Sequence, residues 1–370
     1  HLTAGTGWIY LGGLAMVVHY WGSGGRGGGG WKWARRALWF FLATWGVGAI
    51  VVAVTLAAGS YAGREYFFVS VPASVLFWVG WLPVAWVFLR SGGGAESGGL
   101  GGQPVYRWMW MSSFGLFTYA FVETHAFLLP YFQGHPLRDM AVEWKSYGTL
   151  VGSFNLLVYG SLAYLGQRLN PGNNYGRSRM AFALFWVGVL NSFTNYGHHT
   201  YHVPQTHVLK WVSFIVSMTE IVILAKVAWD VWGLARRYQR ERGRAWDLVT
   251  WLLGATTAWT CIGLVLSIAI SVPPLNSFIH GTYVVAGHAM GSMLGVDTMG
   301  LLAALTWVYA KDREAAGGGP VNLPRWPAAV LNLGVLLLWG SFLALGMNDS
   351  INRWESGLLP SFSVWPVWFG

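Results

Sequence analysis

Several histidines of this chain lie where an imidazole is costly unless it binds something. His280 and His288 are eight residues apart in an apolar stretch at residues 279–310, and Met290 follows two residues later. A second group, His198 and His199, forms an adjacent pair. In a hydrocarbon environment a polar ring needs a partner, and neutral imidazole is the commonest protein ligand of metals and haem iron. The residue types therefore predict a metal or haem site.

Other polar residues have simpler explanations. His19 and His125 are best explained as histidines that hydrogen bond to neighbouring backbone carbonyls. His202 and His207 lie beside a predicted loop, where water can solvate them. Glu220 lies within a predicted helix, where a buried carboxyl either relays protons or forms a structural hydrogen bond.

The elements that must position these residues are membrane-spanning helices. The chain is 54% hydrophobic and only 10% charged, whereas a soluble domain carries roughly 25% charged residues. Apolar runs near the ~20 residues needed to cross a bilayer occur at 3–20, 37–58, 67–89, 108–131, 146–166, 180–197, 207–235, 248–272, 279–310 and 326–347. We therefore expect an all-α integral membrane protein of about ten transmembrane helices. Residues 1–370 form a single domain in this prediction, with glycine-rich loops at 21–30 and 91–102.

Charge predicts the orientation of these helices. Lys and Arg concentrate in alternate loops, which the positive-inside rule places in the cytoplasm, so both ends of the sequence are expected on the outer side. The net charge of +9 then reflects topology and not a nucleic-acid partner. Cys261, the single cysteine, excludes a disulfide framework and a cysteine-ligated cluster. In this topology His1, the 198–199 pair and the 280–288 pair all lie in the outer half of the membrane.

The motifs together resemble the haem-copper oxidase superfamily. H-G-T-Y-V-V-A-G-H-A-M at 280–290 resembles the family's tenth-helix motif, and N-Y-G-H-H at 195–199 resembles its histidine pair for a non-haem metal. Trp211, Ser217 and Glu220 are similar to the Trp, Ser and Glu of nitric oxide reductase catalytic subunits. The tyrosine-bearing motif of oxygen-reducing members is not found beside the paired histidines. The family's first and twelfth helices have no counterpart among the ten runs.

The resemblance implies a role for each residue. His288 would be the axial ligand of a high-spin haem, and His280 would bind a haem propionate, with Arg64 or Arg138 as outer partners. His1 and Met290 would hold a low-spin haem, while His198 and His199 would bind the second metal. The implied cofactors are one or two haems b and a non-haem iron or copper.

The resemblance also implies partners and a location. These are membrane lipid and other subunits of a respiratory-type complex, including a cytochrome c or another electron donor. The implied location is a prokaryotic-type energy-transducing cytoplasmic membrane.

The chain departs from the family pattern at three positions. Asn155 and Tyr159 stand where nitric oxide reductases have a third histidine and a glutamate for the non-haem iron. Glu123, on the preceding helix, is a candidate replacement. Met290 stands where the family has its low-spin haem histidine, although Met/His ligation of haem is chemically sound.

Two functions stay open on this evidence. The first is an oxidoreductase that reduces two NO to N2O, with Glu220 as its proton relay. The second is a degenerate, non-catalytic relative that serves as a haem-carrying electron-transfer or structural subunit. A transporter that uses membrane histidines for protons is a weaker third alternative.

Overall fold

The computed structural model describes residues 2–23, 29–62, 64, 69–90, 102–170, 172, 174–202, 206–242, 247–319 and 323–357. Over these residues the chain consists of helices and the turns between them, with no strand. Its internal contacts divide it into two compact units. The first comprises His1–Ala163 and Asn174–Phe185, and the second comprises Tyr164–Asn173 and Trp186–Gly370.

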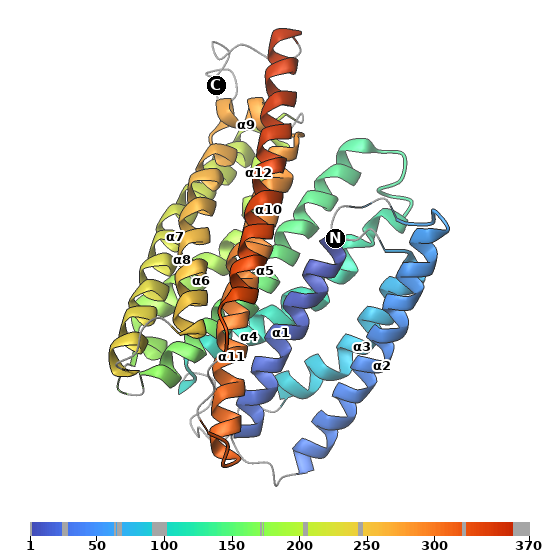
Figure 1. The fold of residues 1–370 in the computed structure, drawn as a ribbon. Coiled ribbons are helices and arrows are strands. Elements are labelled where there is room, and N and C mark those ends of the chain that lie inside the picture. Colours follow the sequence, from blue (N-terminus) through green and yellow to red (C-terminus); the bar gives the residue numbers. More distant parts are fainter. Residues whose placement is uncertain are drawn as a thin grey trace. The chain divides into compact units, whose positions relative to one another are not determined.

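The first unit is built on aromatic packing between long helices (Figure 1). It contains α1 (Leu2–Ser23), α2 (Gly29–Ala57), α3 (Val71–Arg90), α4 (Val105–Thr124), η2 (Ala126–Leu128), η3 (Asn174–Arg177) and parts of α5 (Pro136–Leu169) and α6 (Arg179–Thr194). Trp81 of α3 is fully buried, and its ring packs 4.6 Å from that of Phe114 of α4. A buried hydrogen bond between Tyr10 and Ser153 ties α1 to α5.

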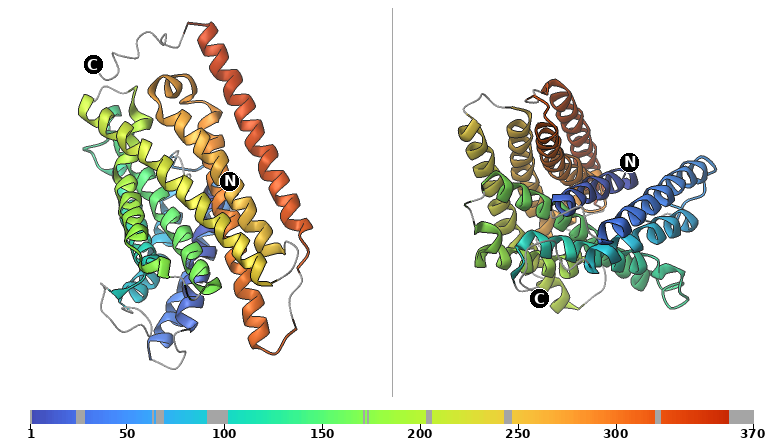
Figure 2. Two further views of the ribbon diagram at one scale, coloured as in Figure 1. Left: turned by 90° about the vertical axis from the view of Figure 1, so that its left-hand side faces the viewer. Right: turned by 90° about the horizontal axis from the view of Figure 1, so that it is seen from below.

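The second unit carries the histidine motifs. It contains η4 (Asn195–Thr200), α7 (His207–Arg242), α8 (Leu248–Ser271), α9 (Pro273–Ile279), α10 (Tyr283–Met290), η5 (Gly291–Asp297), α11 (Thr298–Ala315) and α12 (Trp326–Glu355). Helices α7 and α8 pack side by side, as do α10 and α12 (Figures 1 and 2). Asp247 begins α8 as its N-cap, because its carboxylate accepts from the Thr250 backbone N–H.

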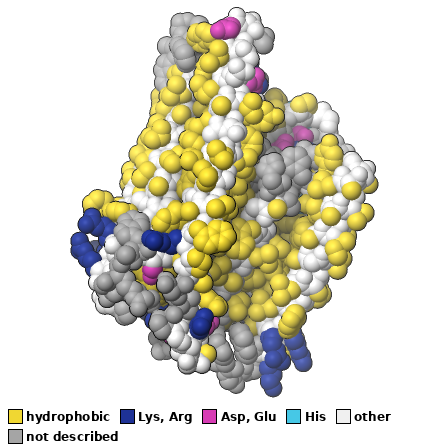
Figure 3. Space-filling view, viewed as in Figure 1, with side chains coloured by type: hydrophobic (Ala, Val, Ile, Leu, Met, Phe, Trp, Pro, Cys, Tyr) yellow, Lys and Arg dark blue, Asp and Glu magenta, His cyan; other side chains and the backbone are white. Residues whose placement is uncertain are grey.

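The helices confirm the predicted all-α membrane fold. Over the described residues, most of each of the ten apolar runs falls on a helix or a series of helices, and seven described helices are long and apolar enough to cross a membrane. Helix α6, with 16 residues, is shorter than these seven. Hydrophobic side chains run along the visible surface of α12 (Figure 3), and Val330 and Leu337 are each 62% exposed. Such a surface is suited to lipid.

The prediction of one helix over residues 279–310 is wrong at its start. Gly281 adopts a φ of 74°, a conformation that ends the preceding helix and that a side chain would disfavour. Thr282 then caps a new helix by accepting from the Val284 N–H, so the span runs over Tyr283–Ala315. His280 therefore lies in a turn before the span, and His288 alone of the two histidines lies within the span.

The middle of this span is a π-helix. In η5 the backbone steps five residues per hydrogen bond, as at Thr298, whose N–H and Oγ1 both bond to the Met293 carbonyl. Gly295 lets α8 approach closely here, since a Cβ at this position would lie 2.4 Å from Trp259. The sequence pattern gave no indication of this segment.

Candidate functional site

Three histidines from two separate motifs meet in the second unit. The rings of His198 and His199, both in η4, have centroids 4.1 Å apart. Nδ1 of His199 lies 3.1 Å from Nε2 of His280, which occupies the turn between α9 and α10. The histidine pair predicted to bind a metal thus contacts the histidine predicted to bind a propionate.

Asn276 of α9 organises this cluster and was not anticipated from the sequence. It is fully buried and donates to the backbone carbonyls of His198 and Ile270, over 3.0 and 2.7 Å. Its Oδ1 lies 3.0 Å from Nε2 of His202. The available signal was a lone amide in the mostly apolar segment P-P-L-N-S-F-I, directly before His280. His202 is exposed, as expected for a solvated ring, and it also joins the cluster through this contact.

Ser217 of α7 fixes the orientation of His198. Its Oγ lies 3.1 Å from Nδ1 of His198, and both side chains are buried. A hydrogen bond to one ring nitrogen orients an imidazole and leaves the other nitrogen as the metal-binding atom. Ser217 is accordingly the residue that would hold the His198 ring in position for a metal.

The cluster favours neutral imidazoles. Burial lowers the pKa of His199 well below its usual value, and repulsion from His198, His280 and His288 adds to this effect. Burial, followed by repulsion from His202, lowers the pKa of His280 to about 4. These groups lie outside the membrane spans, and their rings are uncharged at pH 7. The neutral ring is the form that binds metal ions.

His288 of α10 fits the binding of a haem iron. Its Nδ1 is buried and has no hydrogen-bond partner among the described residues. A buried polar atom without a partner is costly, and an imidazole is the ordinary axial ligand of haem iron. Met290, one half-turn further along, is buried at 3% exposure.

The second metal site is incomplete within the part of the chain that the structure describes. No group of three or more His, Cys, Asp or Glu side chains there could hold a metal ion. Asn155 and Tyr159 belong to α5 in the first unit, where the Oδ1 of Asn155 is buried without a hydrogen-bond partner among the described residues. Glu123, the candidate replacement ligand, forms an ion pair with Lys145 at 2.6 Å.

Two predicted site residues lie wholly or partly outside the described residues. His1 precedes the described residues, and the side chain of Glu220 is likewise outside them, although its backbone lies within α7. Their predicted roles as a low-spin haem ligand and a proton relay stay predictions.

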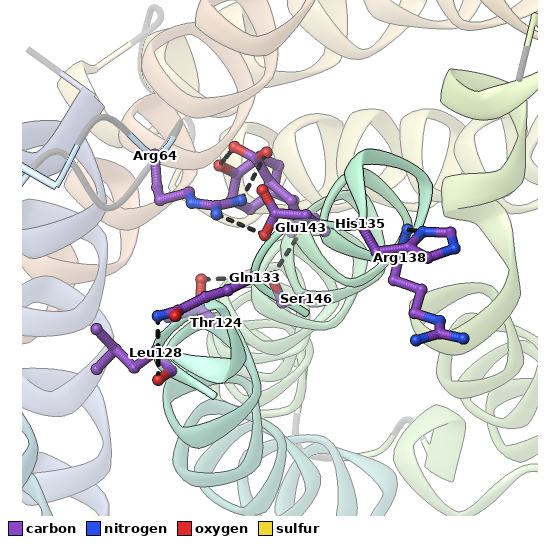
Figure 4. Close-up of polar contacts among 10 residues, drawn as sticks. Arg64, Thr124, Leu128, Gln133, His135, Arg138, Glu143 and Ser146 are labelled. Atoms are coloured by element: carbon purple, nitrogen blue, oxygen red, sulfur yellow. Dashed lines mark hydrogen bonds and ion pairs between the residues drawn. The ribbon is translucent and has the colours of Figure 1, made fainter. Parts of the chain in front are cut away.

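The arginines proposed as outer partners lie in the first unit, in different surroundings (Figure 4). Arg64 forms ion pairs with Asp139 at 2.6 Å and Glu143 at 3.0 Å. Arg138 is exposed, with its guanidinium 4.3 Å from the centroid of the Tyr131 ring. Arg64 is thus already neutralised by two protein carboxylates.

Comparison with known proteins identifies the family. The chain matches the model of the family described as Cytochrome C and Quinol oxidase polypeptide I over residues 1–369. A search of curated proteins gave no match. Members of this family are multi-span helical membrane proteins that bind haem and a copper or non-haem metal. The helical spans, the histidine cluster and this match over nearly the whole sequence lead to one conclusion: the chain belongs to the cytochrome c and quinol oxidase polypeptide I family, within the haem-copper oxidase superfamily.

Proposed function

We propose that this chain, by family a membrane oxidoreductase of haem-copper oxidase type, reduces nitric oxide to nitrous oxide. The observation that supports this proposal best is the contact between His198 and Ser217. It joins the histidine pair to the α7 segment that bears Trp211, Ser217 and Glu220. This segment carries the resemblance to nitric oxide reductase catalytic subunits.

The residues present can be assigned to the two cofactor positions. His288 would hold a high-spin haem, and His198 and His199 would hold a non-haem iron or copper. When bound, the haem and the second metal supply the redox chemistry that converts two NO, two protons and two electrons into N2O and water. Ser217 orients the His198 ring, and Asn276 holds the His198 backbone and the His202 ring in place.

Further roles follow from the resemblance. His1 and Met290 would hold a low-spin haem, His280 would bind a propionate, and Glu220 would carry protons along α7. Members of the family work in multi-subunit respiratory complexes, so a cytochrome c or another donor is the proposed source of electrons. Both ends of the sequence are proposed to lie on the outer side of an energy-transducing cytoplasmic membrane.

The alternative function is a non-catalytic, haem-carrying subunit. It is favoured by Asn155 and Tyr159, since an amide binds iron poorly and a phenol binds it only when ionised. It is also favoured because no group of three or more His, Cys, Asp or Glu side chains among the described residues could hold a metal ion. A chain with a haem at His288 and an empty second site would transfer electrons without reducing NO.

The test is to measure haem, iron and copper content and NO consumption of the purified full chain. Two haems, one non-haem iron or copper ion and NO consumption are expected, whereas haem without NO consumption would identify the alternative. His288→Ala should abolish the high-spin haem spectrum. His125→Ala is the matched control, because that ring bonds the Phe121 carbonyl in the first unit and should leave the spectrum unchanged. A preparation without haem would contradict both functions.

A further inference from the structure

Asp297 is a buried carboxyl that the proposed chemistry does not use. It ends the π-helix η5 and is 0% exposed. Both of its carboxylate oxygens are buried without a hydrogen-bond partner among the described residues. An ionised carboxylate in this situation would carry a large desolvation cost, because no hydrogen bond from the described residues compensates for it.

The helices packed against η5 supply no such cation near Asp297. On its own span, the nearest titratable or charged groups are His288 and Tyr309, at ~13 and ~18 Å of helical rise, before the charged segment 311–314. Tyr283 lies further away, at the start of α10. Neither His288 nor Tyr309 is a permanent cation.

Helices α8 and α12 are also uncharged at this level. Trp259 of α8 contacts Gly295 and donates to Asn332 of α12, which marks the level of η5 on both helices. The titratable or charged groups of α8 and α12 and of their caps lie away from the level of η5 or on the exposed surface. They are Asp247, Cys261, Arg325, Asp349, Arg353 and Glu355.

The side chain of Asp297 points away from the side of η5 that packs against α8 and α12. Gly291 and Gly295 face Trp259 of α8, and Gly291 also faces Trp339 of α12. Residues two positions apart in a helical turn point roughly half a turn apart, so Asp297 projects from the side away from Gly295. A π-helical turn often marks a functional position in a helix.

We propose that Asp297 is a proton-binding site, held as a neutral carboxylic acid within the membrane span. The carboxylate takes up one proton and releases it again, with no redox step. Asp297 lies on the cytoplasmic side of His288 in the predicted topology, where protons from that side would arrive first. The site does not depend on whether nitric oxide or another molecule is the substrate.

Infrared spectroscopy of the purified full chain labelled with carboxyl-13C aspartate tests this inference. The chain has six aspartates. Asp139, Asp230 and Asp349 form ion pairs, Asp247 caps α8 and Asp312 is exposed. At pH 7 only Asp297 should therefore give the carbonyl band of a protonated acid, shifted by the label and by D2O. The absence of an aspartate acid band at pH 7 would overturn the proposal.

Substitutions assign the band. Asp297→Asn should remove it completely, because the amide keeps the shape of the side chain without the acid. Asp349→Asn, which removes an ion-paired carboxylate, should leave the band unchanged. A band that persists in Asp297→Asn would also overturn the proposal. The labelled wild-type chain decides the question alone if the asparagine variant does not fold.

Discussion

The Nδ2 atom of Asn276 donates to the backbone carbonyl oxygen of His198 over 3.0 Å. This bond links the turn that carries the histidine pair to the short helix that precedes His280. Asn276 also bonds to Ile270 and His202, so a single amide holds parts of three elements. The relative position of the two histidine motifs thus depends on this one side chain.

Replacement of Asn276 should destabilise the protein. Asn276→Ala leaves two buried backbone carbonyls without these bonds and removes the contact to the exposed His202 ring, at roughly 3 kcal/mol in total. The thermal unfolding midpoint of the purified chain should fall markedly. Ser277→Ala is the control, because Ser277 donates to the carbonyl of Pro273 within its own helix. Equal midpoints for the two variants would contradict the role of Asn276.

Replacement of Ser217 should lower the affinity for the non-haem metal and leave the stability of the fold almost unchanged. Loss of a hydrogen bond that orients a metal-binding histidine typically lowers metal affinity about 10–100-fold. Ser217→Ala should therefore lower the non-haem metal content while the unfolding midpoint changes little. Ser213→Ala, one turn earlier on α7, removes a bond to the Thr194 carbonyl and should keep the metal. The same metal content in both variants would show that Ser217 does not support the site.

A side chain at position 295 should clash with Trp259. In Gly295→Ala the new methyl would lie 2.4 Å from the indole, and overpacking of this kind typically costs about 1–3 kcal/mol. Gly263→Ala on α8 meets no atom within 4 Å and should be neutral or slightly stabilising. Thermal unfolding of both variants checks the contrast. A Gly295→Ala variant as stable as Gly263→Ala would mean that α8 does not approach η5 so closely.

Loss of Arg64 should destabilise the first unit. Arg64→Ala leaves Asp139 and Glu143 without their cation, and this partly buried pairing is worth roughly 1–3 kcal/mol. Arg138→Ala makes the same chemical change at an exposed site and should cost under about 1 kcal/mol. Denaturant or heat unfolding measures the difference. Similar losses for the two arginines would indicate that the ion pairs of Arg64 contribute little.

The sequence predicted the helices well and the breaks between them poorly. Apolar length alone locates spans such as Leu248–Ser271, because a bilayer requires that length of any helix. Apolar length does not reveal that Gly281 adopts a positive φ, because apolar residues continue before and after the short segment His280–Thr282. The π-helical turn at Gly291–Asp297 is hidden for the same reason.

The site was predicted by residue type but not by arrangement. His198, His199, His280 and His288 were singled out because imidazoles are costly in apolar segments. The contact between His199 and His280 joins positions 81 residues apart, which spacing along the chain cannot predict. Asn276 was overlooked because an amide has no metal chemistry of its own, and its importance comes only from what it bonds.

The five-residue step in η5 has a consequence for how this span tolerates changes in length. A turn that holds one residue more than an α-helical turn can lose that residue and still continue as a helix. Deletion of a single residue at this turn would restore ordinary α-helical spacing and keep the faces of α10 and α11 in their present register. The same deletion within α8 would rotate every later residue of that helix by roughly 100° relative to its neighbours. The π-turn is therefore the one place in this span where a single residue can be deleted while α10 and α11 keep their packing against neighbouring helices.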